Sequence, residues 1–216
     1  MSFFTVIIPT RDRPDEFRLA LDSVLSQTCA DVEIVVVDDG TDEKPREALE
    51  KIKIDVGSKV KWVHLDRRTR GHGRSFAQNS GVAVSSGEYL CTLDDDDTWI
   101  DDDYLKRVRS VIENFGDRVD LYLTTQVAYL NGEKQTGPAW IESLTDIYRK
   151  ERRTPNSQGV FSVEVDDLLR LEGFCHLNTT IVRRGLYEAV GGIDESLRYE
   201  EDRDLYLRSE FPSYGS

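Results

Sequence analysis

The sequence predicts an α/β fold with a mainly parallel sheet flanked by helices, and three observations point to it. Short β-branched apolar runs alternate with segments whose apolar residues recur at helical spacing. The strand-like runs are continuously apolar, as expected of strands that are covered on both faces. Clusters of charged residues directly follow several of these runs. The 216 residues are enough for one large domain with a substantial hydrophobic core.

Strands and helices alternate through the first half of the chain. Residues 3–8 form a continuous apolar run that Pro9 ends, so we expect the first strand there. Pro14 suits the first turn of the helix that should follow. Further strands are expected at residues 32–40, 59–65 and 87–94. Helices are expected at residues 13–28, 43–53, 75–86 and 101–116.

The second half of the chain is less regular. Residues 120–135 should form a hairpin, because Asn131 and Gly132 suit a two-residue type I′ turn. Residues 142–159 are polar, and we expect a mobile loop there. We also expect a strand at residues 174–184 and a helix at residues 185–192. A last helix is expected late in residues 193–210. No repeat or clear linker divides the chain, which favours a single domain, either complete or part of a longer polypeptide.

The charge balance limits the kinds of partner that the protein can have. Its 28 Lys and Arg against 41 Asp and Glu give a net charge of −13, which argues against nucleic acid and anionic membranes as partners. Residues 59–74 depart from this balance, with six basic side chains and one acidic one. A confined basic patch of this kind suits a small anion, such as a phosphate group, better than a polymer.

Cysteine usage and the N-terminus favour a cytoplasmic protein. Cys29, Cys91 and Cys175 are scattered and fit no metal-ligand spacing, so we expect reduced thiols. Pro9 and Arg11 end the apolar N-terminal run far short of the ~20 residues that a membrane span needs. This run also lacks the basic start and small-residue cleavage site of a secretory signal. We therefore expect no integral membrane segment.

Four polar segments that follow predicted strands should meet in space. Right-handed crossovers place the C-terminal ends of parallel strands at one edge of the sheet, and ligands bind outside that edge. The four segments are residues 9–13, 38–40, 67–74 and 94–97. Their convergence on one rim is the main structural prediction from the sequence.

Seven of the ten residues 94–103 are aspartates, and they divide into two groups. Asp101, Asp102 and Asp103 precede an amphipathic helix, where carboxylates cap free N–H groups and oppose the helix dipole. Residues 94–97 directly follow a strand, and unit charges ~4 Å apart repel by about 4 kcal/mol at an effective dielectric of about 20. A divalent cation removes this repulsion, and oxygen ligands favour Mg²⁺ or Mn²⁺. A solvated acidic loop is the alternative.

Five blocks, in the same order, are similar to the family 2 glycosyltransferases of GT-A fold. They are TVIIPTRDRPDEFRLALDSVLSQT, VEIVVVDDGTDE, GRSFAQNSGVAVSSGEYLCTLDDDD, VGGIDESL and EEDRDLYLR. The resemblance covers nearly the whole chain of residues 1–216 and implies a single Rossmann-like GT-A domain with a mixed, mainly parallel sheet. It also implies an inverting, metal-dependent enzyme that moves a sugar from a nucleotide-sugar, usually a UDP-sugar, to a glycan or lipid-linked acceptor. Residues 1–100 would form the nucleotide-sugar-binding half and residues 101–216 the acceptor-binding half.

The resemblance implies where the nucleotide would bind. The matching positions are Pro9, Thr10, Arg11, Asp39, Arg68, Arg74, Asp94 and Asp95. Among them, Asp39 matches the acid that hydrogen-bonds the base, and Asp95 matches the ribose contact. Residues 67–74, which we call the basic loop, correspond to a variable segment, so the arginine that contacts the diphosphate is left open among Arg68, Arg70 and Arg74.

The resemblance also implies a metal ligand and a catalytic base. Asp96 matches the ligand of Mn²⁺ or Mg²⁺, and Asp202, next to Glu201, matches the base at the start of a helix. A base must take the acceptor hydroxyl proton while the oxygen attacks the anomeric carbon, and a neighbouring carboxylate raises its pKa toward neutrality. Helix capping is the alternative explanation of these acids.

Some features depart from the family or leave other functions open. Gln78 stands where the family often has Arg, so Arg74 could replace one phosphate-side cation. Trp140 and His176 could contact an acceptor sugar, although either could serve only in packing. A nucleotidyltransferase is one alternative function, but no glycine-rich loop follows the first strand. A catalytically inactive nucleotide-sugar-binding domain is the other, but Asp96 and Asp202, the acids matched to metal binding and catalysis, are both present.

Overall fold

The computed structural model describes residues 2–115, 119–130, 132–135, 141–170 and 175–210. Its centre is a six-stranded sheet in the order β3-β2-β1-β4-β8-β5. These strands are β1 (Phe4–Thr10), β2 (Val32–Asp38), β3 (Val60–His64), β4 (Tyr89–Thr92), β5 (Leu121–Leu123) and β8 (Thr180–Arg183). The first four pair in parallel, whereas β8 is antiparallel to both β4 and β5. The prediction of a mixed, mainly parallel sheet is therefore confirmed.

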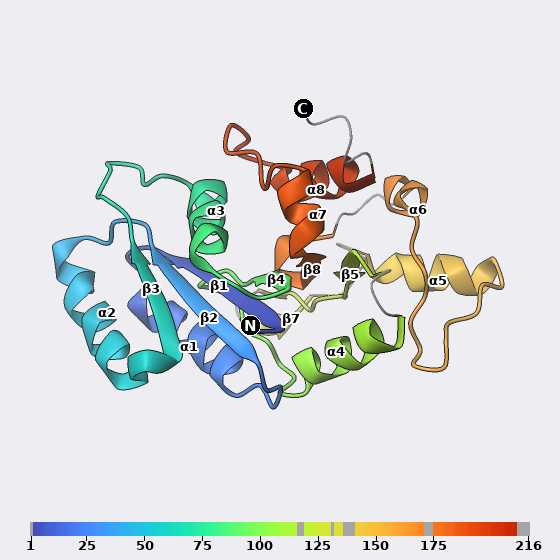
Figure 1. Cartoon of the computed structure of the whole chain (residues 1–216), viewed down its shortest axis with the longest axis horizontal. Helices are drawn as coiled ribbons and strands as arrows, with labels where there is room; N and C mark the ends of the chain where they lie inside the picture. The colour runs from blue at the N-terminus through green and yellow to red at the C-terminus, as the bar shows by residue number, and fades with distance from the viewer. Residues whose placement is uncertain (1, 116–118, 131, 136–140, 171–174, 211–216) are drawn as a thin grey trace.

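Helices cover both faces of this sheet (Figure 1). They are α1 (Pro14–Leu25), α2 (Glu43–Val56), α3 (Arg74–Val84), α4 (Tyr104–Phe115), α5 (Glu142–Lys150), α6 (Val165–Leu169), α7 (Arg184–Ala189) and α8 (Glu201–Glu210). Apolar side chains of α1, α2 and α4 are buried on one face, together with Phe4, Val6 and Ile8 of β1. Side chains of α3, α7 and α8 are buried on the other face with Ile7, because successive strand residues point to opposite sides. Within the described ranges, none of the helices is both long and apolar enough to cross a bilayer.

The close packing of α3 on β1 depends on Gly81. A β-carbon at this position would lie 2.6 Å from Cγ2 of Ile7 and 3.2 Å from Cγ2 of Val37. A larger residue would therefore push the helix away from the sheet. This packing holds Arg74, the first residue of α3, near the C-terminal ends of the parallel strands.

The mobile loop expected at residues 142–159 is a helix in its first part, so that expectation is wrong there. In α5, Leu144 and Tyr148 are buried in a cluster with Leu168 of α6 and Tyr206 of α8. Apolar side chains four residues apart lie on the same side of a helix, and their burial outweighs the polar composition of the segment. Beyond α5, turns and irregular structure follow.

Two expected β elements are shorter than the sequence suggests. The expected hairpin over residues 120–135 is divided, because β5 joins the main sheet and only β6 (Tyr129–Leu130) and β7 (Glu133–Lys134) pair with each other. Gly132 has a φ of +80°, as a type I′ turn requires, and Asn131 lies outside the described residues. The strand expected from residue 174 begins only with β8, after a 3₁₀ turn, η3 (Leu177–Thr179).

Candidate active site

The turn after β1 and the acidic turn after β4, residues 94–97, are joined by ion pairs. Arg13 contacts Asp95 at 2.5 Å and Asp96 at 2.6 Å. Oγ1 of Thr10 donates a hydrogen bond of 2.8 Å to Asp95, which is only 2% exposed. Burial raises the pKa of Asp95, while this hydrogen bond and the charge of Arg13 act in the opposite direction. The predicted meeting of strand ends is confirmed for these two turns, although Arg13 was not among the predicted site residues.

Asp39, after β2, is held by the basic loop that follows β3. Its carboxylate accepts hydrogen bonds from the backbone N–H of His72, at 2.9 and 3.0 Å, and from that of Gly73, at 3.3 Å. Nδ1 of His72 lies 2.7 Å from the same carboxylate, and its ring stacks on Phe76. Gly71 allows this approach, since its φ is +71° and a β-carbon there would clash with Asp39. His72 was not predicted, because only the arginines of this loop had a recognisable role.

A cavity of about 300 Å³ lies where these segments meet, and we call it the donor cavity after the nucleotide-sugar donor that the sequence resemblance implies. It is lined by Pro9, Thr10, Arg11, Arg13, Asp39, Arg74, Ala77, Asp94, Asp95 and Asp96. The structure thus brings together every residue that was predicted to contact the nucleotide or the metal, except Arg68, and the alternative Arg70 is not among the described lining residues either. The side chain of Arg68 is exposed, and its carbonyl oxygen accepts a 2.9 Å hydrogen bond from Nη2 of Arg11. This bond ties the basic loop to the end of β1.

Three carboxylates of the acidic turn are close enough together to hold one metal ion. Asp94, Asp96 and Asp97 each have an oxygen within 4.8 Å of the other two. Burial and the charge of Asp96 raise the pKa of Asp94. Asp97 is exposed, but partial loss of water around its carboxylate and the charges of Asp94 and Asp96 raise its pKa as well. Closely spaced carboxylates with oxygen-only chemistry fit a hard divalent cation. Asp97 was not predicted as a ligand, because the order of four consecutive aspartates does not show that Asp95 turns toward Arg13 instead.

Asn178, on η3, holds the acidic turn from the second half of the chain. Its Oδ1 accepts a 3.0 Å hydrogen bond from the backbone N–H of Asp94. Its Nδ2 donates to the carboxylate of Asp94 at 3.2 Å and also to that of Asp97. Asn178 is buried, so these bonds are shielded from water. The sequence offers no signal for this contact, since 84 residues separate Asn178 from Asp94.

Arg74 connects the acidic turn with the predicted catalytic acids at the start of α8. Its guanidinium lies 3.0 Å from Asp94 and 3.6 Å from Glu201. Asp202 is 7% exposed, and burial raises its pKa. The charge of Glu201 raises this pKa as well, whereas the backbone N–H of Arg203 lowers it. The acids of α8 therefore lie on the same side of the molecule as the acidic turn, although neither is among the described residues lining the donor cavity.

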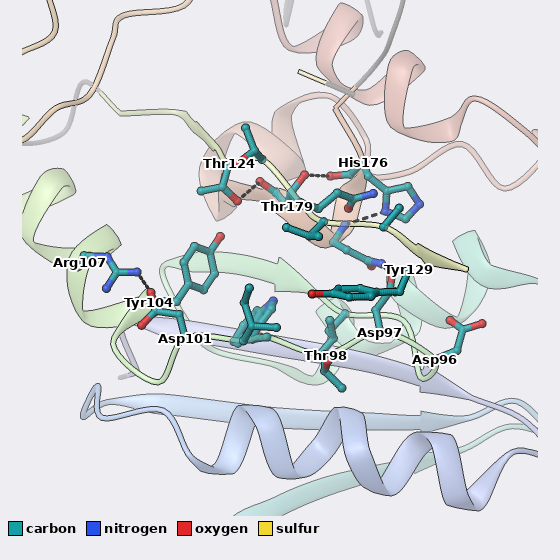
Figure 2. Close-up of a pocket in the computed structure, with 18 residues that line it drawn as sticks. Asp96, Asp97, Thr98, Asp101, Tyr104, Arg107, Thr124, Tyr129, His176 and Thr179 are labelled. Atoms are coloured by element: carbon teal, nitrogen blue, oxygen red, sulfur yellow. Dashed lines mark hydrogen bonds and ion pairs between the residues drawn. The ribbon is translucent and has the colours of Figure 1, made fainter. Parts of the chain in front are cut away.

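A second, larger cavity of about 760 Å³ adjoins the donor cavity at Asp96, which lines both. Figure 2 shows this second cavity, with Asp96 and Asp97 along one edge and with Tyr129 and His176 nearby. Burial is the main cause that lowers the pKa of His176, which favours the neutral ring. Trp140, the other predicted acceptor contact, lies outside the described residues.

Comparison with solved structures identifies the class of fold. S. aureus TarS in complex with UDP matches 98% of this chain and 56% of its own, with a TM-score of 0.67 and 20% identity. Mannosyltransferase PcManGT from Pyrobaculum calidifontis, in complex with GDP-Man and Mn²⁺, matches 96% of this chain and 51% of its own, with a TM-score of 0.63 and 19% identity. The fold is that of the GT-A glycosyltransferases.

Sequence comparison then identifies the family. The family model of glycosyl transferase family 2 matches residues 5–189, and the chain belongs to this family. A PGL/p-HBAD biosynthesis glycosyltransferase of Mycobacterium tuberculosis is 26% identical over 205 residues, which are 95% of this chain and 68% of that protein. An uncharacterized glycosyltransferase of Rickettsia typhi is 26% identical over 204 residues, 94% of this chain. The chain spans 57% of the length of that relative.

Proposed function

We propose that the protein is an inverting glycosyltransferase that moves a sugar from a nucleotide-sugar to a hydroxyl of a glycan or lipid-linked acceptor, assisted by Mn²⁺ or Mg²⁺. The observation that carries this proposal is the connected site in which Arg74 links the acidic turn to the acids of α8. A UDP-sugar is the preferred donor, because the matched TarS structures include complexes with UDP and with UDP-GlcNAc. The matched mannosyltransferase was solved with GDP-Man and Mn²⁺, which supports a divalent ion.

The nucleotide would lie along the donor cavity. Asp39 would accept a hydrogen bond from the base, while Pro9, Thr10 and Arg11 would line the nucleoside. The ribose would contact Asp95.

The diphosphate would lie beside Arg74, with Arg68 available on the neighbouring loop. Gln78 cannot supply a charge and is fully buried. The cation that family members often carry at that position is therefore best replaced by Arg74, one helical turn earlier on α3.

The metal would be held by Asp94, Asp96 and Asp97. A bound divalent ion supplies Lewis-acid stabilisation of the negative charge that develops on the departing diphosphate. Asn178 keeps two of these carboxylates in position, and Arg13 pairs with Asp96 from the opposite turn. Arg13 must therefore share Asp96 with any ion bound there.

Asp202 would act as the base. Its carboxylate accepts the proton of the acceptor hydroxyl while that oxygen forms a bond to the anomeric carbon. The bond between this carbon and the diphosphate oxygen breaks with its electron pair, so a nucleoside diphosphate leaves and the configuration inverts. The raised pKa of Asp202 makes it a stronger base than an ordinary aspartate. Glu201 would hold Arg74 and contribute to this raised pKa.

A panel of nucleotide-sugars tests the proposed function. Thermal unfolding is followed with UDP-, GDP- and ADP-sugars, each with and without Mn²⁺. We expect one donor to stabilise the protein by roughly 2.7 kcal/mol at a hundredfold excess over Kd, and only with the ion. Transfer to an acceptor then distinguishes an enzyme from an inactive binding domain. Absence of stabilisation by every nucleotide-sugar would contradict the proposal.

A further inference from the structure

The second cavity has exposed apolar side chains that the proposed transfer chemistry does not require. Ile100, Tyr129 and Val127 are 82%, 62% and 40% exposed, and all three line this cavity. They are three of the ten large hydrophobic side chains that are exposed in the described part of the chain. Exposed apolar side chains gathered around one cavity mark a place where a ligand or partner covers them.

These side chains come from two segments that are distant in sequence. Ile100 follows the acidic turn, whereas Val127 lies just before β6 and Tyr129 is the first residue of β6. Trp99 also lines the cavity and packs edge-on against Tyr104, with ring centroids 5.1 Å apart. Aromatic and aliphatic surface therefore extends from the edge of the acidic turn to the β6–β7 hairpin.

The charges of the second cavity disfavour an anionic occupant. Asp96 and Asp97 lie at the edge near the donor cavity, and Asp101 is paired with Arg107. Arg107 is the only Lys or Arg among the described residues that line this cavity, and its charge is already matched by Asp101. No unpaired Lys or Arg is therefore left among the described lining residues to bind a phosphate or carboxylate, whereas an uncharged molecule needs no such partner.

We propose that the acceptor is an uncharged glycoside with an apolar aglycone. Its sugar would lie against Tyr129 beside Asp96, with the aglycone covering Ile100 and Val127. This inference rests on the proposed function and names the class of its acceptor. An aromatic ring offers an apolar face to the C–H side of a sugar, and a cavity of 760 Å³ is within the usual range for small-molecule sites. The shared Asp96 places the sugar next to the donor.

Binding and rate measurements with matched glycosides test this inference. Methyl, hexyl and phenyl glycosides of common hexoses, together with the hexose 6-phosphates, are compared by saturation-transfer NMR in the presence of UDP and Mn²⁺. The same compounds are then assayed as acceptors, with UDP-GlcNAc and other UDP-sugars as donors. We expect the hexyl and phenyl glycosides to bind at least tenfold more tightly than the methyl glycosides, and the phosphates not to bind. Equal affinity for methyl and hexyl glycosides, or preference for the phosphates, would overturn the proposal.

Substitutions locate the effect within the protein. Ile100→Ser and Val127→Ser should reduce the hexyl-to-methyl affinity ratio toward one, because they remove the apolar contacts. Ile54→Ser is the matched control, since Ile54 is 78% exposed on α2 and is not among the described residues lining the cavity. Tyr129→Ala should weaken every glycoside about tenfold, whereas Tyr129→Phe should retain binding. An equal loss of the hexyl-to-methyl affinity ratio in Ile54→Ser, or no loss in Ile100→Ser, would contradict the assignment of the second cavity to the aglycone.

Measurements of nucleotide binding distinguish failure of the proposed acceptor class from failure of the proposed function. If calorimetry detects UDP with Mn²⁺ but the hexyl glycosides show no advantage, only the acceptor class is wrong. If no nucleotide-sugar binds, the proposed function fails and the acceptor assignment fails with it.

Discussion

The two cavities that share Asp96 are built in different ways. Around the donor cavity, charged groups are paired across strand ends, as Arg13 is with Asp95 and as Asp39 is with the basic loop. Around the second cavity, apolar side chains such as Ile100 and Tyr129 are exposed. A ligand that enters a network of ion pairs must form ion pairs or hydrogen bonds with its charged groups. Exposed apolar side chains instead favour ligands by their size and hydrophobicity. In the proposed function, donor recognition would thus be tied to the sheet edge, and acceptor recognition to the segment after the acidic turn and the residues around β6.

The largest effect is expected for Asp202→Asn, which should leave both cavities intact and remove transfer. Loss of a general base lowers kcat by on the order of 10²–10⁴-fold. The affinity for UDP with Mn²⁺ should stay the same, as measured by calorimetry. Asp204→Asn is a matched control on the same helix, because Asp204 pairs with Arg208 and should not affect kcat. A variant with Asn at position 202 that turned over at the normal rate would show that the base is elsewhere.

Asp96→Ala should affect ligand binding in the two cavities differently, because only binding of the donor is expected to need the metal. We expect the affinity for UDP in Mn²⁺ to fall at least tenfold, which corresponds to about 1.4 kcal/mol. The affinity for UDP without the ion should change little. Asp102→Ala serves as a control in the same acidic stretch, where its carboxylate accepts a hydrogen bond from Ser26. Unchanged metal dependence in Asp96→Ala would argue against Asp96 as a ligand.

Asn178→Ala should weaken the connection between the acidic turn and η3. Leaving Asp94 and Asp97 without their buried partner should cost about 1–3 kcal/mol of the free energy of unfolding, measured in urea. The variant should also require more Mn²⁺ for UDP binding. Asn79→Ala, which removes hydrogen bonds to Ile193 and Tyr187, should destabilise the fold without changing the Mn²⁺ requirement. The same Mn²⁺ requirement in both variants would mean that Asn178 has only a structural role.

The smallest effect is expected from pH. Loss of water and the charges of neighbouring acids raise the pKa of Asp94 and Asp97, so the folded state retains protons that the unfolded state has already lost. Stability without metal should therefore fall as pH rises through these pKa values, and a metal ion should offset that loss. Mn²⁺ at a tenfold excess over Kd should raise Tm by about 3–6 °C near neutral pH and by less under acidic conditions. An equal shift at both pH values would exclude these carboxylates as the ligands.

The sheet and its rim were predictable because their signals are local. The apolar run of β1 and the acids after β2 and β4 each lie within a few residues, and parallel pairing brings the strand ends together. The expectation that Pro9 ends the first strand is wrong, because β1 continues through Pro9 to Thr10, where both residues still pair with β2. The partners within the rim were not predictable. Arg13 and His72 are recognised as site residues only once the fold shows which carboxylate each contacts. The same holds for Asn178, whose contact joins the two halves of the chain.

The errors in the second half have a similar physical origin. The burial of Leu144 and Tyr148 in α5 depends on α6 and α8, which supply the other side of the cluster. In the same way, the assignment of β5 to the main sheet depends on β8, which follows more than 50 residues later. A polar composition or a good turn pair therefore predicts a segment correctly only when its partners are close in sequence.

The hydrogen bonds from the basic loop to Asp39 affect how a nucleotide could bind there. The backbone amides of His72 and Gly73 already donate to this carboxylate, so a nucleobase bound to Asp39 as proposed would have to exchange with them. Residues 67–74 should then lose protection against amide hydrogen exchange when nucleotide arrives, while the strands beneath gain it. Binding of the base at Asp39 would in this way loosen the hydrogen bonds of the whole basic loop.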